Sequence, residues 1–239
     1  MKKSIFALLL FSIFSINFAC EAQSNADDSY LFKEPSWDGT GKIYLGREIS
    51  QVMGFAGKDW LERADREREE GISAALKNLP INPNSIIADI GAGSGYYTFR
   101  ISPLVPEGKI YAVDIQDDAV AYIKKRSVEL GMDNIIPIKG TEKSPNLPKG
   151  QVDLIIMVDV YHELAYPQEM LGAIYEALKP DGKILLLEYK GEDPTIAIKP
   201  LHKMTEQQAK KELKSNGFQF VENGKFLPIQ HYIIFEKVK

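Results

Sequence analysis

The strongest constraint on the fold is a glycine-rich turn at residues 89–98, with the sequence Asp-Ile-Gly-Ala-Gly-Ser-Gly-Tyr-Tyr-Thr. A mostly apolar run at residues 85–88 precedes it and is long enough for one buried strand, and residues 97–101 predict the first turns of a helix. Glycines between a strand and a helix allow a sharp turn and place backbone N–H groups at the start of the helix. The turn therefore predicts an α/β unit in which a ligand can approach the backbone closely.

The spacing of the glycines separates two classes of ligand. A dinucleotide-binding turn needs Gly-x-Gly-x-x-Gly, and its third glycine would fall at position 96, which is Tyr96. The chain instead has Gly-x-Gly-x-Gly with an acidic residue two places ahead of it, which resembles motif I of class I S-adenosylmethionine (SAM) methyltransferases. The resemblance implies that the turn lies against the methionine part of SAM. The cofactor-binding residues that it implies here are Asp89, Gly91, Ala92, Gly93 and Gly95.

Two later segments support this resemblance. Residues 109–114 predict a second strand that ends in Asp114, about 25 residues after Asp89, which is close to the spacing of a ribose-binding acid. We expect Asp114 and its neighbour Ile115 to contact the cofactor. The segment Leu-Lys-Pro-Asp-Gly at residues 178–182 is similar to the turn that precedes the fifth strand of the family.

The resemblance also implies contacts at the two ends of the cofactor. Thr141 and Glu142 follow the third predicted strand, where many relatives use an aspartate on the adenine amino group. Either Glu142 replaces that aspartate or backbone groups alone contact the adenine. Asp159, after the fourth predicted strand at 152–158, is expected to face the methionine end.

The residues after Asp159 are the best candidates for chemistry. Ligands of open α/β sheets bind beyond the carboxyl ends of the strands, and this loop neighbours the glycine turn in the family's strand order. His162 and Glu163 are the candidate catalytic residues, because a histidine with a pKa near neutral can accept a proton. Tyr161 and His202 are candidate substrate-binding residues. In the alternative interpretation, His162 only forms hydrogen bonds within its loop.

The order of predicted elements gives the fold class. Strands and helices alternate from residue 60 to residue 239 and end in two consecutive strands. The resemblance implies a doubly wound, mostly parallel α/β fold with a seven-stranded sheet in the order 3-2-1-4-5-7-6 and strand 7 antiparallel. One helix is expected from about residue 60 to residue 79. Residues 23–59 are expected to form a tether and an irregular N-terminal cover, which either packs on the surface or closes over the site.

The N-terminus has the layout of an export signal. Lys2 and Lys3 precede a mostly apolar run at residues 5–18, and small residues follow, as expected for a signal at residues 1–22. The pair Ala19-Cys20 resembles the end of a bacterial lipoprotein signal, in which the cysteine is lipidated. Cleavage after Ala22 and an uncleaved anchor helix are the alternatives. We therefore expect an exported protein that is periplasmic or membrane-anchored through Cys20, rather than a cytoplasmic one.

Composition limits the partners. The formal net charge of −4 and the pI near 5.5 argue against a protein that coats nucleic acid. The single cysteine excludes a disulfide within a monomer and a cysteine-based metal cluster, and no metal site is predicted. We expect a SAM-dependent methyltransferase with a small-molecule acceptor, no nucleic-acid partner, and membrane contact only through the N-terminal signal or lipid anchor. The alternative is an exported domain that binds SAM or a nucleoside without turnover, and the oligomeric state stays open.

Overall fold

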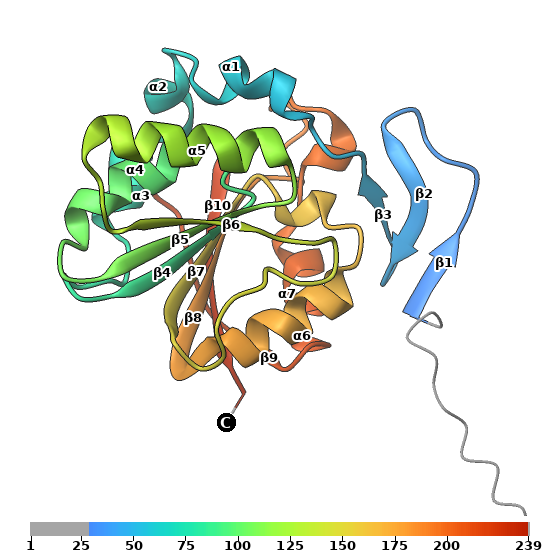
Figure 1. The fold of residues 1–239 in the computed structure, drawn as a ribbon. Coiled ribbons are helices and arrows are strands. Elements are labelled where there is room, and N and C mark those ends of the chain that lie inside the picture. The colour runs from blue at the N-terminus through green and yellow to red at the C-terminus, as the bar shows by residue number, and fades with distance from the viewer. Residues whose placement is uncertain (1–28, 239) are drawn as a thin grey trace, which may run out of the picture.

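The computed structural model describes residues 29–238 and centres on a seven-stranded sheet (Figure 1). Its strands, in chain order, are β4 (Ile86–Ile90), β5 (Lys109–Asp114), β6 (Ile135–Lys139), β7 (Val152–Val158), β8 (Leu178–Tyr189), β9 (Phe218–Gly224) and β10 (Gln230–Lys237). The spatial order is β6-β5-β4-β7-β8-β10-β9, and β10 runs antiparallel to both of its neighbours. This is the predicted order 3-2-1-4-5-7-6 with an antiparallel seventh strand, so the fold class is confirmed.

Helices cover both faces of the sheet (Figure 1). The α-helices are α1 (Lys58–Leu61), α2 (Arg66–Glu70), α3 (Ile72–Lys77), α4 (Tyr96–Ile101), α5 (Asp117–Leu130), α6 (Pro167–Ala177) and α7 (Glu206–Lys214). Short 3-10 helices are η2 (Phe55–Gly57), η3 (Ser102–Leu104), η4 (Tyr161–Glu163) and η5 (Pro200–His202). One core cluster packs α6 and α7 on the sheet and another packs α3 and α4 on it, which fixes the strand ends that carry the site.

The prediction of one helix from residue 60 to residue 79 is wrong. The segment forms three short helices, and Gly71 separates α2 from α3 in a left-handed conformation with φ of 73°. The sequence pattern failed because its apolar stripe continues across this glycine, which ends α2 and begins α3. Arg63 lies in the turn between α1 and α2, Arg66 is the first residue of α2, and both line the site described below.

Regular structure also replaces the irregular cover expected before residue 60. Three antiparallel strands, β1 (Tyr30–Phe32), β2 (Gly39–Tyr44) and β3 (Arg47–Ser50), form a separate small sheet. A two-residue turn joins β2 to β3, and both of its residues, Leu45 and Gly46, have positive φ, which suits a tight hairpin. This sheet lies beside η4 and α7 at one end of the large sheet (Figure 1).

The N-terminal signal prediction cannot be compared with this fold. Residues 1–22 and Cys20 lie outside the described residues. Between residues 29 and 238, no helix has the length and apolar character needed to cross a membrane.

Candidate functional site

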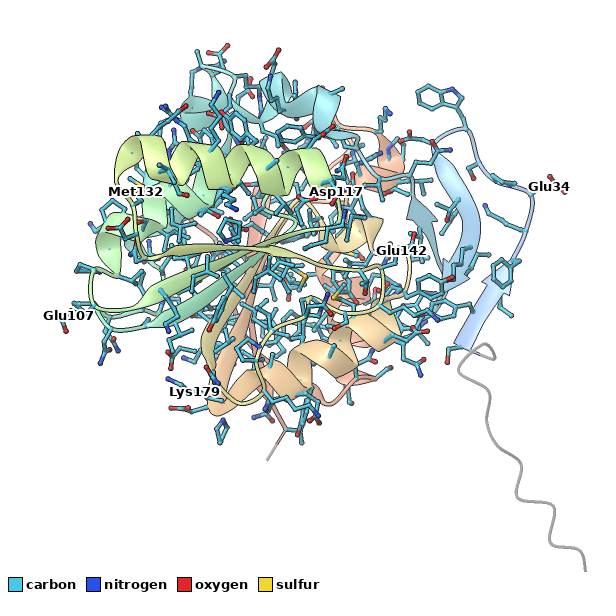
Figure 2. All side chains as sticks on the ribbon, viewed as in Figure 1. Glu34, Glu107, Asp117, Met132, Glu142 and Lys179 are labelled. Carbon is cyan, nitrogen blue, oxygen red and sulfur yellow. The ribbon has the colours of Figure 1, made fainter. Side chains whose placement is uncertain are left out.

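A cleft of about 880 Å³ lies beyond the carboxyl ends of β4, β5, β6 and β7. Figure 2 labels residues at both edges of the sheet: Asp117 and Glu142, which follow β5 and β6, lie at the edge with the cleft, and Glu107 and Met132, which precede these strands, lie at the other edge. The predicted cofactor residues that line the cleft are Gly91, Gly93, Asp114, Ile115, Thr141, Glu142 and Asp159. Open parallel sheets bind ligands at this edge.

The glycine turn forms one wall of the cleft and uses its own N–H groups internally. The Gly91 and Ala92 N–H groups donate to the Val113 carbonyl at 2.8 and 3.0 Å, and the Gly93 N–H donates to Asp114 Oδ2 at 2.9 Å. Gly91 has φ of 74°, and a Cβ there would lie 2.3 Å from Val160 Cγ2. The turn therefore offers a flat backbone surface for close approach and no set of free donors for a pyrophosphate.

Three predicted cofactor residues support the turn from behind and do not line the cleft. Ala92 is buried in the core, and Gly95 precedes the first residue of α4. Asp89 is 3% exposed and accepts a hydrogen bond from Thr98 Oγ1 at 2.6 Å, which ties β4 to α4. Burial raises the pKa of Asp89 to about 6.

Asp114 stands at the end of β5 with its carboxylate facing the cleft. Oδ2 accepts from the Gly93 N–H, and Oδ1 accepts from the Gln116 N–H at 2.8 Å. Burial raises the pKa of Asp114, and these backbone hydrogen bonds partly oppose that rise. Each oxygen accepts one such backbone bond and keeps a lone pair, so the carboxylate can accept both hydroxyls of a ribose.

Gln116 is a site residue that sequence reasoning missed. Its side-chain Oε1 accepts from the Phe55 N–H at 2.7 Å, and its Nε2 donates to the Met53 carbonyl at 3.2 Å. Gln116 thus fastens residues 53–55, which form part of the cover, over the end of the cleft that contains Asp114. No local motif marks it, because its partners lie about 60 residues earlier in the chain.

At the opposite end of the cleft, Thr141 and Glu142 follow β6. Thr141 Oγ1 accepts from the Ser144 N–H at 3.0 Å and closes its own turn, so the hydroxyl is already engaged. Glu142 is exposed and lines the cleft. Both interpretations of the adenine contact therefore stay open: the adenine contacts either the Glu142 carboxylate or only backbone groups.

A second cavity, of about 1090 Å³, adjoins the first. The two share five lining residues, namely Val52, Met53, Leu61, Asp159 and Glu163. Trp60, Arg63 and Arg66 line the second cavity as well. Both arginines pair with the buried Glu70, at 2.5 and 2.8 Å.

Asp159 lines both cavities and lies where they meet, and its contact with the methionine end of SAM remains a prediction. Its backbone has φ of 52°, which is uncommon for a non-glycine residue. Oδ2 accepts from Gln230 Nε2 at 2.7 Å, whereas Oδ1 is buried without a hydrogen-bond partner. Burial, with Glu70 and Glu188 nearby, raises the pKa of Asp159 well above its usual range. An orphaned carboxyl oxygen at this point fits the ammonium group of SAM.

His162, Glu163 and His202 come together on the wall of the second cavity. His162 is 1% exposed, and its Nδ1 lies 2.6 Å from Glu188 Oε2, while its Nε2 lies 3.1 Å from His202 Nδ1. Glu163 Oε1 lies 3.5 Å from His202 Nδ1 and accepts from the Met53 N–H at 3.2 Å. The pairing with Glu163 raises the pKa of His202, although burial opposes it.

Tyr161 does not take the predicted place at the substrate. It is fully buried, lines neither cavity, and donates its hydroxyl to Glu212 Oε2 at 2.9 Å. In the short η4 helix, Tyr161 points into the core, whereas the next residue, His162, faces the cavity.

The small N-terminal sheet holds this cluster in position. Arg47 donates to the His162 carbonyl at 2.9 Å and forms a two-point pair with Glu212 at 2.8 and 2.9 Å. Asp38, between β1 and β2, places Oδ2 2.7 Å from His202 Nε2, at an angle that does not make a hydrogen bond. The segment before residue 60 therefore closes the second cavity and does not merely pack on the surface.

Comparison with known proteins agrees with this geometry. Residues 88–184 match the sequence model of a family described as a methyltransferase domain. An uncharacterised methyltransferase of Bacillus subtilis is 27% identical over 128 residues, which are 53% of this chain and 50% of the relative. A tRNA U34 carboxymethyltransferase of Desulfotalea psychrophila is 32% identical over 113 residues, which are 46% of this chain and 34% of the relative.

A solved structure shows the same fold over a larger part of the chain. A SAM-dependent methyltransferase from Aquifex aeolicus superposes with a TM-score of 0.73 at 23% identity, over 78% of this chain and 100% of that one. Residues 88–184 thus match a methyltransferase domain, the chain has the fold of SAM-dependent methyltransferases, and the two similarities together support SAM as the cofactor. The chain spans half or less of the two curated relatives above, and none of these matches specifies a subfamily.

Proposed function

We propose that this protein transfers the methyl group of SAM to a small acceptor that binds in the second cavity. The observation that carries the proposal is the junction of the two cavities at Asp159 and Glu163. Methyl transfer is an in-line displacement, and its main requirement is alignment of the acceptor with the S–CH₃ bond in a site that excludes water. Two adjoining cavities under one cover meet that requirement.

The histidine cluster is placed to take a proton from the acceptor. SAM supplies an electrophilic methyl carbon, whose bond to sulfur breaks as the acceptor's lone pair attacks it. Glu188 holds the proton on His162 Nδ1, so the Nε2 lone pair of His162 faces His202 and the cavity. The proton that the acceptor loses then passes to the cluster formed by His162, Glu163 and His202, which makes an O–H or N–H acceptor the best fit.

A small molecule fits this site better than a nucleic acid does. One similar protein is a tRNA-modifying enzyme, so nucleic acid is the alternative acceptor. The net charge of −4 disfavours a phosphate backbone, and both arginines on the wall of the second cavity are paired with Glu70.

The first experiment is a metabolite screen scored by release of S-adenosylhomocysteine. With an acceptor in hand, His162→Gln should slow methyl transfer 10²–10⁴-fold and leave the affinity for SAM within about twofold. The matched control is His231→Gln, because His231 lies outside both cavities and pairs with Glu192 at 2.9 Å. A full rate in His162→Gln would exclude the proton-transfer role.

Tight SAM binding without any turnover would instead favour the alternative, an exported domain that binds SAM or a nucleoside. Export is itself part of the proposal, with Cys20 as a lipid anchor. Cys20→Ala should then abolish incorporation of labelled fatty acid and membrane association. A full-length protein recovered from the cytoplasm would refute export, and a soluble mature chain beginning at Gln23 would refute the lipid anchor.

A further inference from the structure

Three donor atoms meet at one point on the wall of the second cavity. His162 Nε2 and His202 Nδ1 are 3.1 Å apart, and Glu163 Oε1 lies 3.8 Å from the first and 3.5 Å from the second. The point equidistant from these three atoms is about 2.0 Å from each of them, which is the length of a zinc–nitrogen or zinc–oxygen bond. The three side chains could therefore bind one ion with little movement.

Carboxylates flank the two imidazoles on the side away from this point, although only Glu188 forms a hydrogen bond. A carboxylate lies against each outer nitrogen: Glu188 is 2.6 Å from His162 Nδ1, and Asp38 is 2.7 Å from His202 Nε2. The hydrogen bond from Glu188 keeps the His162 proton on Nδ1 and leaves the Nε2 lone pair facing the point, as in metal-bound histidines. When His202 carries its proton on Nε2, next to Asp38, two imidazole lone pairs and a carboxylate oxygen converge on one point, and a cation there would interact favourably with all three.

The charge around the cluster favours a divalent cation over a single proton. Three carboxylates, Asp38, Glu163 and Glu188, surround the two imidazoles. Lys199 pairs with Asp38 at 2.8 Å, and Arg47 donates only to the His162 backbone carbonyl in this cluster. A lone proton shared between the histidines offsets one of these negative charges, whereas a divalent ion offsets two.

We propose that His162, Glu163 and His202 form a binding site for a divalent transition-metal ion, with zinc the best match to two imidazoles and one carboxylate. The remaining coordination position faces the cavity that all three side chains line. The inference rests on the proposed function and changes one step of it: with an ion bound, the acceptor would lose its proton to solvent, and the ion, in place of a protonated histidine, would stabilise the resulting anion. The three residues are candidate site residues from the sequence, but no metal site is expected from it, because the two histidines are 40 residues apart and no ligand spacing links them.

The test is metal binding by untagged, chelator-treated protein without SAM or acceptor. Titration with Co²⁺ should give d–d absorption bands that saturate at one ion per chain, and Zn²⁺ should displace the Co²⁺ and release protons as the imidazoles are ligated. His162→Gln, Glu163→Gln and His202→Gln should each weaken binding at least 100-fold. Asp38→Asn, which removes the charged neighbour of His202 and of Lys199 but none of the three proposed ligands, should weaken it about 10- to 100-fold.

The control is His231→Gln, which should bind Co²⁺ like the wild type. Circular dichroism of each variant distinguishes loss of the metal site from loss of the fold. Asp38→Asn keeps the test decisive if a ligand variant does not fold, because Asp38 lies on the loop between β1 and β2 and not within a helix or strand. No saturable binding by the wild type, or equal binding by the wild type and the Asp38 and His202 variants, would refute the site. Stoichiometric metal binding that these variants abolish would support the site even if no acceptor is ever methylated. Failure of the proposed methyl transfer can therefore be distinguished from failure of the metal site.

Discussion

Replacing Asp114 with alanine should weaken SAM binding about 30- to 100-fold. The Asp114 carboxylate is 5% exposed, and each of its oxygens already accepts one backbone hydrogen bond. In the complex, each oxygen gains a ribose hydroxyl, and a hydrogen bond to a charged group is worth about 1.5–3 kcal/mol. Water that enters the shortened site recovers part of this energy. A net loss of about 2–3 kcal/mol remains, which is the stated factor in affinity.

Isothermal titration of SAM and of S-adenosylhomocysteine into both proteins measures this loss. If Asp114 binds the ribose, which both ligands contain, both should lose affinity by the same factor. The matched control is Asp117→Ala, which removes an exposed carboxylate three residues later that pairs with Lys139 at 2.8 Å. That variant should bind both ligands as the wild type does.

The same substitution leaves the half-buried Gly93 N–H without its acceptor. The free energy of unfolding should therefore fall by about 1–3 kcal/mol, which urea denaturation of the ligand-free protein detects. Equal SAM affinity in wild type and Asp114→Ala would refute the ribose assignment. A loss for SAM with none for S-adenosylhomocysteine would place the contact at the methyl-bearing end instead.

Two further predictions concern stability. The pKa of Asp89, about 6 in the fold against about 3.9 in the unfolded chain, means that about 2–3 kcal/mol of stability present below pH 4 is lost as the pH rises through 6. Asp89→Asn keeps an acceptor for the Thr98 hydroxyl and does not ionise. The free energy of unfolding of this variant, relative to that of the wild type, should therefore rise between pH 4 and 8. Parallel pH profiles of the two proteins in urea unfolding would contradict this. Arg47→Met should lower the free energy of unfolding by about 3–5 kcal/mol, because it leaves Glu212 charged and buried. Adding Glu212→Gln should recover part of that loss, and a single-variant loss under about 1 kcal/mol would show that the pair does not hold the small sheet in place.

The parts of the fold that the sequence predicts are those encoded by short, contiguous patterns. The glycine turn and Asp114 follow from a strand, a turn and a strand within about 25 residues, and the strand order then places His162 beside the cofactor cleft. Each of these steps needs only local periodicity and the geometry of parallel sheets.

The parts that it does not predict depend on contacts between distant segments. The strands β1 to β3 are short, and β1 exposes Leu31 and Phe32, so no alternation of buried and exposed residues marks them. The proximity of Asp38 to His202 joins a hairpin near the N-terminus to a turn after β8, and no spacing in the sequence encodes it. The prediction that Tyr161 contacts the substrate is wrong because residues 161–163 form a 3-10 turn. In such a turn, unlike in a strand, the sequence pattern does not show which of two neighbouring side chains faces the core.

The two cavities draw on different parts of the chain, which has a consequence for how such a protein can diversify. All but three of the residues that line the cofactor cleft lie within residues 88–184, the segment shared with other methyltransferases. All but three that line the second cavity lie outside that segment, either before it, in residues 38–66, or after it, from the last residue of β8 to His202. Mutations can therefore accumulate in the walls of the second cavity while the cofactor cleft is preserved. Lineages that inherit one ancestral donor site can in this way acquire different acceptors, and resemblance confined to the shared segment carries little information about which acceptor each has come to use.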